Sequence, residues 1–583
     1  MRSVTQLNKN WYFLAGDTPD HRPPRFRDKA WQCVDLPHAP AEGFGQYYWY
    51  CKSVPLERML GERVYLRLDC PGANLRLFVD GKQVEKLRAG QVHVVELTQY
   101  HRRRRPLLIA LRFRGQAGAL LGGLPRGVAS ILVPQSHFSF DAKGAQGIAV
   151  STQLVEGGAA KVKVNASVLL PSDGQKVTFA IGGPHITVPV TAAGAEFAIP
   201  RPRLWTPEDP FLYSLRAILT HQDGTHLDTV DVPFGVRSLT LHPQEGAQWN
   251  GVSVPLRGVL RQTPAPGQAL PFEKERALLF DIGANALVLT GTPESAAYYD
   301  QCDAAGLRVF QTLPRLSDYK ERKDGLDAAK KLVFALLNHP SIAGWIVHAQ
   351  EESATRALCE LVAHGDGTRP VLLQTNDAAS LEAWGDLPAE GIVLPTVAKP
   401  DLPALDKGHA THPSRTLCLC TDAADDEELW PALGQLEVMP EVLTDRPWLN
   451  LLAGARLYPH SAADKGALLD EQNAPTDVYY LARALGGLKP EASEETSEGG
   501  DKKSAEPPAV KLFVHVCAVN PKHKNTVVVF SNAPAVTLTV NGKKIGTAQG
   551  ESVFGFEKVK LKAGDNTVEA AYGETKHERV IHV

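Results

Sequence analysis

The sequence contains no run of about 20 apolar residues, the length that a helix needs to cross a bilayer, so we expect no membrane-spanning helix. It also has no excess of basic residues: 62 Lys and Arg stand against 65 Asp and Glu, for a formal net charge of −3. A chain without an overall positive field does not attract nucleic acid or membrane phosphates. Neither nucleic acid nor a membrane is therefore expected as a partner.

Cysteine is scarce, with eight residues scattered over the chain. Only Cys418 and Cys420 are close together, and they alternate with leucines in a strand-like run. No C-x-x-C pair and no Cys/His cluster with zinc spacing occurs, so we expect neither a metal nor a cofactor. The first 16 residues have no apolar core and no small-residue cleavage site. We therefore expect a reduced, cytoplasmic protein, and a secreted or periplasmic one only if a leader has been removed.

Several common catalytic motifs are also missing: no Ser/His/Asp triad motif, no P-loop and no G-x-G-x-x-G after a strand. What is present is typical of a globular protein, with 43% hydrophobic and 22% charged residues. At roughly 150 residues per domain, a chain of 583 residues predicts about four domains.

The N-terminal part of the chain has the pattern of β-structure. In residues 1–132, short segments alternate apolar and polar residues, and Asp80-Gly81 is typical of a hairpin turn. In residues 133–239, five or more strands follow one another at the spacing of an immunoglobulin-like β-sandwich. We therefore predict two β-sandwich domains in succession.

The pattern changes after Trp249, where helix-like segments alternate with apolar strands. Over residues 240–488 this repetition matches a (β/α)₈ TIM barrel, whose typical size is about 250 residues. Residues 489–508 have no aromatic or large aliphatic side chain and are predicted to be a flexible linker. Residues 509–583 return to strands, with a hairpin turn at Asn541-Gly542, and are predicted to form a last β-sandwich.

Specific motifs accompany this domain order. The most specific are LPHAP (36–40), PRLWTPEDPFLYSL (202–215), VDVPFGVRSL (230–239), WNGVSVPLRGV (249–259), NHPSIAGW (338–345) and GTRPV (367–371). Together they resemble glycoside hydrolase family 2, the β-galactosidase and β-glucuronidase family. The resemblance implies a multidomain β plus α/β fold: a jelly-roll sugar-binding-like domain, an immunoglobulin-like sandwich, a TIM barrel and a C-terminal immunoglobulin-like sandwich.

The catalytic positions depart from the family. Retaining glycosidases need two carboxylates about 5–5.5 Å apart, one as acid/base and one as nucleophile. The acid/base position, counted from NHPSIAGW, is Gln350. The resemblance separately puts the nucleophile position at Thr421. An amide cannot protonate a leaving alkoxide. The displaced candidates are Glu351 and Asp422, each one residue further along, although a carboxylate in a loop or at a helix start is the favoured interpretation of both.

Other positions that the resemblance assigns to the substrate are also replaced. The family's conserved Asn, Arg, His and aromatic platform fall on apolar, small or unrelated residues, namely Leu260, Gln262, Val288, Gly291, Ala349, Ala455 and Arg456. Loss of all these positions together favours a barrel that is kept as a scaffold, a catalytically inactive pseudoenzyme.

Three functions remain open. The chain is a non-catalytic homologue that binds a glycan or a protein, a working β-glycosidase that uses Glu351 and Asp422, or a structural assembly subunit. Trp345, His348 and Gln350 are candidates to line a ligand pocket at the barrel mouth, although core packing is favoured for Trp345. The basic run Arg102 to Arg105 suits an acidic polysaccharide, a nucleic acid or an acidic partner, although a solvated turn is favoured. Whether the chain forms a homo-oligomer also stays open.

Overall fold

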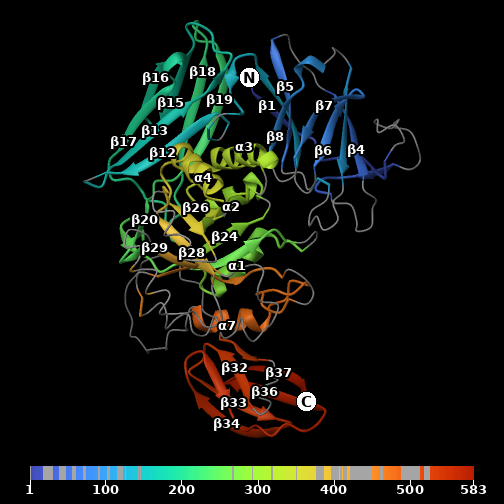
Figure 1. Cartoon of the computed structure of the whole chain (residues 1–583), viewed down its shortest axis with the longest axis vertical. Coiled ribbons are helices and arrows are strands. Elements are labelled where there is room, and N and C mark those ends of the chain that lie inside the picture. The colour runs from blue at the N-terminus through green and yellow to red at the C-terminus, as the bar shows by residue number, and fades with distance from the viewer. Residues whose placement is uncertain are drawn as a thin grey trace, which may run out of the picture.

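The computed structural model places three β-sandwiches around an eight-stranded barrel (Figure 1). The residues that it describes are 2–17, 31–38, 47–55, 61–69, 74–88, 92–100, 105–114, 123–124, 127–141, 143–144, 146–155, 157–264, 268–291, 293–316, 319–349, 351–375, 387–395, 406, 410, 416–420, 445–446, 449–459, 464–486, 512–517 and 526–583. The predicted linker, 489–508, and the arginines at 102–104 lie outside these ranges.

The first sandwich consists of a six-stranded and a four-stranded antiparallel sheet, in the orders β3-β2-β4-β9-β6-β7 and β1-β10-β5-β8. Its strands are β1 Ser3–Gln6, β2 Trp11–Ala15, β3 Gln32–Val34, β4 Tyr47–Val54, β5 Glu62–Leu68, β6 Leu75–Val79, β7 Lys82–Leu87, β8 His93–Glu96, β9 Leu107–Arg114 and β10 Val128–Pro134. Alternating side chains, among them Leu75, Leu77 and Val79, fill the space between the sheets. The predicted hairpin is confirmed, since Asp80 and Gly81 form the β6–β7 turn with φ of 48° and 81°.

The second sandwich pairs the sheets β12-β13-β17 and β16-β15-β18-β19, with a short ladder of β11 and β14 beside them. Its strands are β11 His137–Phe138, β12 Ile148–Leu154, β13 Ala160–Ala166, β14 Val168–Leu169, β15 Lys176–Ile181, β16 His185–Pro189, β17 Gly194–Ile199, β18 Tyr213–Thr220 and β19 His226–Phe234. Arg2, just before β1, forms an ion pair of 2.7 Å with the buried carboxylate of Asp228 in β19. This ion pair connects the two N-terminal sandwiches to each other.

The barrel is closed and consists of eight parallel strands, as the α-then-β repetition predicts. Its strands are β23 Arg257–Gln262, β24 Ala286–Thr290, β25 Arg308–Thr312, β26 Ile342–His348, β27 Val371–Gln374, β28 Gly391–Pro395, β29 Thr416–Cys420 and β30 Asn450–Arg456. The described helices around it are α1 Phe272–Asp281, α2 Ala296–Ala305, α3 Tyr319–Leu336, α4 Glu352–Gly365 and α7 Asp477–Gly486. None of these helices is long and apolar enough to cross a membrane.

A small sheet closes one end of the barrel. It consists of β20 Leu239–His242, β21 Gly246–Trp249 and β22 Val252–Ser253, and its Leu241 and Trp249 belong to the same apolar core as the barrel interior. Trp249 lies under Arg308, the first residue of β25, and Ala247 donates to Asn450, the first residue of β30. Because these contacts are at the strand starts, the sheet covers the amino-terminal end and leaves the opposite end as the place for a site.

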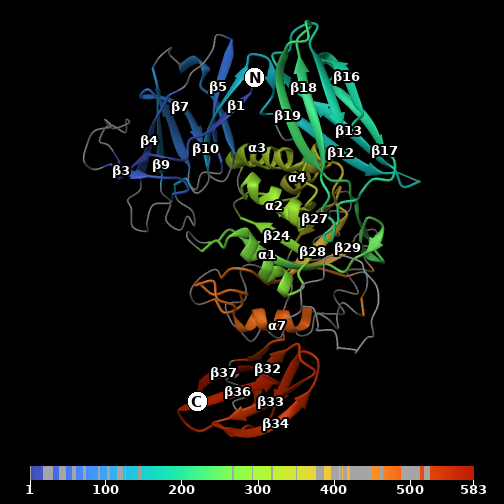
Figure 2. The same ribbon diagram turned by 180° about the vertical axis from the view of Figure 1, so that it is seen from behind.

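The C-terminal sandwich pairs the sheets β31-β32-β35 and β34-β33-β36-β37. Its strands are β31 Val514–Val516, β32 Val527–Ser531, β33 Ala535–Val540, β34 Lys543–Gln549, β35 Val553–Phe556, β36 Asp565–Tyr572 and β37 Thr575–His582. The predicted turn at Asn541-Gly542 connects β33 to β34. Both views show this sandwich next to α7, at the end of the molecule away from the other two sandwiches (Figures 1 and 2).

Candidate functional site

The carboxyl ends of the barrel strands form the candidate site, because βα-loops build the active site in this fold. The last residues of the eight strands are Gln262, Thr290, Thr312, His348, Gln374, Pro395, Cys420 and Arg456. None of these strand ends carries a carboxylate. Their polar side chains are amide, hydroxyl, imidazole, thiol and guanidinium groups, which do not form the acid and nucleophile pair of a retaining glycosidase.

His348 is the described candidate that faces the mouth of the barrel. The pairing of β25 with β26 shifts by one residue after Val309, a bulge that changes which side chains of β26 face inward. Beyond the bulge, Ile346 belongs to the barrel interior, and the next residue of the same phase is His348. Its Nδ1 atom lies 3.3 Å from Nη2 of the exposed Arg315. The mouth therefore has a guanidinium and an imidazole side by side.

Trp345 lies on the outer side of the same strand. Its side chain has no exposed surface and packs in the core between strands and helices. Its Nε1 atom donates a hydrogen bond of 2.7 Å to Oδ2 of Asp366. The core packing that was favoured for Trp345 is therefore confirmed, and this side chain does not line a ligand pocket at the mouth.

The carboxylate candidate that the structure describes, Glu351, is exposed and directly precedes α4. Its Oε1 atom accepts a hydrogen bond of 2.7 Å from the hydroxyl of Ser353. A carboxylate at this place is stabilised by the positive end of the helix dipole. The other three candidates, Gln350, Thr421 and Asp422, lie outside the described residues.

The replaced substrate positions take up structural roles. Leu260 and Val288 are buried in the apolar interior of the barrel. A Cβ atom at Gly291 would come within 2.8 Å of the hydroxyl of Thr263, so this backbone leaves little room for a larger side chain. Arg456 is buried and pairs with Asp464 at 2.8 Å. In the described part of the mouth, neighbouring side chains and backbone thus pack closely against the residues that replace the family's substrate-binding groups.

A buried ionic network beside the mouth was not foreseen from the sequence. Arg261 donates to Glu275 at 2.6 Å and to Glu294 at 2.7 Å. The hydroxyls of Tyr298 and Tyr458 donate to Glu275 at 2.5 and 3.0 Å. Both carboxylates are engaged in these bonds, which connect the ends of β23 and β30 to α1 and α2. The sequence signal that could have indicated this network is the position of Arg261, because its neighbours in β23 face the barrel interior.

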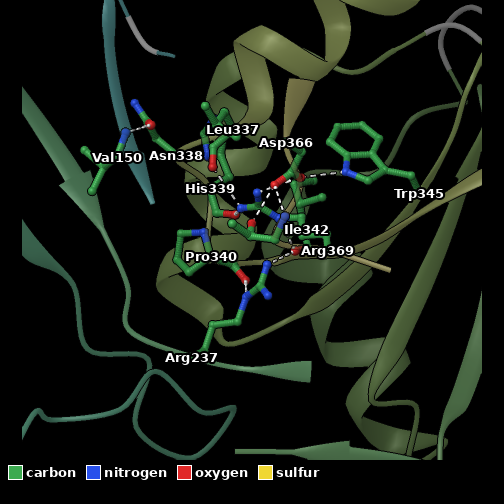
Figure 3. Close-up of polar contacts among 11 residues, drawn as sticks. Val150, Arg237, Leu337, Asn338, His339, Pro340, Ile342, Trp345, Asp366 and Arg369 are labelled. Atoms are coloured by element: carbon green, nitrogen blue, oxygen red, sulfur yellow. Dashed lines mark hydrogen bonds and ion pairs between the residues drawn. The ribbon is translucent and has the colours of Figure 1, made fainter. Parts of the chain in front are cut away.

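Three of the motifs that carry the family resemblance, VDVPFGVRSL, NHPSIAGW and GTRPV, meet at a junction between the second sandwich and the barrel (Figure 3). Asn338 accepts a hydrogen bond from the backbone of Val150 at 2.9 Å and donates to Ile148 O at 2.8 Å. Arg237 donates to the carbonyl oxygens of Pro340, at 3.1 Å, and Ile342. Burial and the nearby charge of Arg369 lower the pKa of Arg237 to about 9.

Arg369 completes this junction from the other side. It donates to the carbonyl oxygens of Leu337, His339 and Ile342 at 2.8–2.9 Å and forms an ion pair of 2.9 Å with Asp366 (Figure 3). The side chains of both partners are almost fully buried. These motifs therefore shape the start of β26, and they do not reach the mouth at its other end.

One group of described residues has the spacing of metal ligands: Asp300, Asp303 and His339, whose ligand atoms lie within 4.8 Å of one another. Its inner members are bonded to other protein groups. Asp303 accepts from the backbone N–H of Ser341 at 2.9 Å and pairs with His339 at 2.6 Å. This arrangement explains the cluster as an ion pair that supports the turn before β26.

Known proteins share both sequence and fold with this chain. Residues 133–237 match the model of Glycosyl hydrolases family 2. A β-glucuronidase of Bacteroides fragilis is 24% identical over 96% of this chain and 90% of its own length. A β-galactosidase of Thermoanaerobacter pseudethanolicus is 21% identical over 60% of this chain and 52% of its own.

Solved structures match along the full chain. An FMN-binding β-glucuronidase from Facaelibacterium prausnitzii L2-6 has a TM-score of 0.77 at 22% identity, covering 100% of this chain and 98% of that one. Bacteroides uniformis β-glucuronidase 2 has a TM-score of 0.75 at 19% identity, covering 100% and 80%. The resemblance to glycoside hydrolase family 2 and the multidomain fold that it implied are confirmed.

Proposed function

We propose that this chain, which resembles glycoside hydrolase family 2 over its length, is a catalytically inactive homologue that binds a carbohydrate at its barrel mouth. The same molecule would offer its sandwiches as a scaffold to a glycan or protein partner. The feature that supports this proposal is that the resemblance places Gln350 and Thr421 at the positions of the two catalytic carboxylates, in a barrel whose described strand ends have no carboxylate.

The physical reason is the chemistry of the retaining mechanism. One carboxylic acid must protonate the leaving oxygen, and one carboxylate must attack the anomeric carbon. The amide of Gln350 neither protonates the leaving oxygen nor attacks the anomeric carbon at neutral pH. Arg315 and His348 supply donors to a bound sugar, and the guanidinium favours a sugar that carries a carboxylate, such as a glucuronide.

A second candidate is an active retaining exo-β-glycosidase that uses Glu351 and Asp422. The relatives support this candidate better than the first, because they are named as β-glucuronidases and β-galactosidases. It requires that the loop after β26 turns Glu351 toward the substrate. In the structure that carboxylate bonds to Ser353 at the start of α4.

Turnover of aryl β-glycosides separates the two candidates. The purified chain and its variants Glu351→Gln and Asp422→Asn are compared on the galactoside, glucuronide, mannoside and glucoside, with calorimetric binding of the same compounds. The matched control is Glu352→Gln, since Glu352 is the exposed neighbour that pairs with Arg356. We expect binding without turnover above the level of the variants. Turnover that both variants abolish and the control retains would establish the active glycosidase.

A further inference from the structure

The C-terminal sandwich contacts the barrel at α7, and polar side chains hold the two together there (Figure 1). Asp477, the first residue of α7, accepts from Nε2 of His515 in β31 at 2.6 Å. The same carboxylate oxygen accepts from Nη1 of Arg579 in β37 at 2.7 Å. The ring of His515 also stacks on Tyr480 of α7, with the centroids 3.8 Å apart. His515 is therefore the residue of β31 that connects the sandwich to the helix through both a charge and a ring.

A second histidine, His577 in β37, lies beside His515. The centroids of the two rings are 4.6 Å apart. The Nδ1 atom of His577 accepts a hydrogen bond of 3.1 Å from the backbone N–H of Val516, the residue of β31 that follows His515. A ring nitrogen that accepts carries no proton, so His577 is uncharged in this arrangement. This bond fixes the position of β31, and with it the position of His515 against α7.

The surroundings of His577 disfavour a positive charge on its ring. Burial, and then the charges of His515 and Arg579, lower its pKa below the ordinary 6.5, while Asp477 acts in the opposite direction. The other charged side chains along this contact are Asp464, Lys465, Asp470, Glu471 and Glu578. A proton on Nδ1 would also set two donors, the ring and the N–H of Val516, against each other. Protonation of His577 therefore costs a hydrogen bond and adds charge repulsion.

We propose that His577 is a pH-sensitive latch between the C-terminal sandwich and the barrel, which holds β31 against α7 when uncharged and loosens this contact when protonated. Because the pKa of His577 is lowered in the docked arrangement, docking has its full stability above about pH 6.5, the value of a released histidine. That stability is lost as the pH falls through the docked value. The change does not depend on whether the barrel mouth binds a sugar.

Hydrogen–deuterium exchange of the full chain, followed by mass spectrometry, tests the latch. Exchange of the amides in α7 and β31 is measured from pH 7.5 to pH 4, and each rate is divided by the intrinsic rate at that pH. We expect exchange at pH 5 to be about twofold to tenfold faster than at pH 7.5, the range for loss of one hydrogen bond. The response should set in below about pH 6.5 and above about pH 4.5, where carboxylates begin to titrate. Strand β24 of the barrel should show no such response.

His577→Gln should abolish the acid response, because its amide oxygen can still accept from Val516 and the side chain takes up no proton. The matched control is His582→Gln, which changes an exposed histidine of the same strand and should retain the response. An unmodified chain without an acid response would overturn the proposal, as would a response that His577→Gln retains. If His577→Gln already loosens the contact at pH 7.5, the onset in the unmodified chain decides: an onset only below about pH 4.5 assigns the response to carboxylates and rejects the latch.

Discussion

The Nδ1 atom of His339 lies 2.6 Å from the carboxylate Oδ2 of Asp303, and this ion pair joins α2 to the turn that begins β26. His339 belongs to NHPSIAGW, one of the motifs that resemble glycoside hydrolase family 2, and Asp303 lies in α2. The pair is nearly buried and lies at the amino-terminal end of β26, away from His348 at the other end. This pair therefore supports the start of β26, and it lies away from the barrel mouth.

The His339–Asp303 pair should make stability depend on pH. Burial by itself lowers the pKa of His339, but the charge of Asp303 and the hydrogen bond to it outweigh burial, so the pKa in the folded chain lies above 6.5. The stabilisation is then complete below about pH 6.5, the unfolded value, and is lost as the pH rises through the folded value. In urea denaturation, the difference in unfolding free energy between the unmodified chain and His339→Gln should shrink from pH 6 to pH 8.5.

His582→Gln is the control for this measurement, because His582 forms an exposed pair with Asp565. An exposed pair contributes little to stability, so this substitution should change the unfolding free energy far less than His339→Gln does. A difference between His339→Gln and the unmodified chain that stays constant over this pH range would contradict the assignment of a charged His339.

Arg369→Ala should be strongly destabilising. The side chain of Asp366 has no exposed surface, and the substitution removes the cation that pairs with its carboxylate. It also removes three hydrogen bonds to carbonyl oxygens at the turn before β26. Loss of one partner of a buried ion pair costs about 3–5 kcal/mol. Chemical denaturation measures this loss. As a control, Arg356→Ala removes the exposed pair with Glu352 and should cost less than about 0.5 kcal/mol. If Arg369→Ala and Arg356→Ala lose the same unfolding free energy, Arg369 does not stabilise the junction.

Gly258→Ala should prevent normal closure of the barrel. A Cβ atom at this position would lie 1.5 Å from the carbonyl oxygen of Leu452, at the pairing of β23 with β30. Overpacking in a core usually costs about 1–3 kcal/mol, and a clash with backbone atoms exceeds what side-chain movement can relieve. We expect a lower melting temperature or insoluble protein. Gly546→Ala in β34, where a Cβ atom meets no other atom within 4 Å, should behave like the unmodified chain.

Arg315→Ala should weaken binding of a glucuronide at the barrel mouth. A hydrogen bond to a charged group contributes about 1.5–3 kcal/mol, which corresponds to roughly 10-fold to 150-fold in affinity. His348→Ala should lower the affinity less, since an imidazole offers fewer N–H donors than a guanidinium. Calorimetry with an aryl β-glucuronide measures both, with the exposed Lys274→Ala as control. If Arg315→Ala binds as tightly as the control, the mouth is not the glucuronide site.

Much of the architecture was predictable because its signals are local. A hairpin turn such as Asp80-Gly81 is encoded by two residues that accept positive φ, and a strand by the alternation of its own side chains. The repetition of helix and strand patterns then predicts a barrel. The site was less predictable: the bulge at Val309 decides which way Trp345 and His348 point, and no residue letter marks it.

The sequence by itself determined the succession of β-sandwiches and the eight-stranded barrel, whereas Gln350 and Thr421 at the catalytic positions stay a prediction from the family resemblance. Only the tertiary structure decided which charged groups are paired in the interior. Tyr458 and Glu275 are separated by 183 residues and come within 3.0 Å only because the barrel closes. Turns and strands depend on neighbours a few residues away, whereas a buried ion pair depends on the whole fold, and so it is invisible in the pattern of one segment.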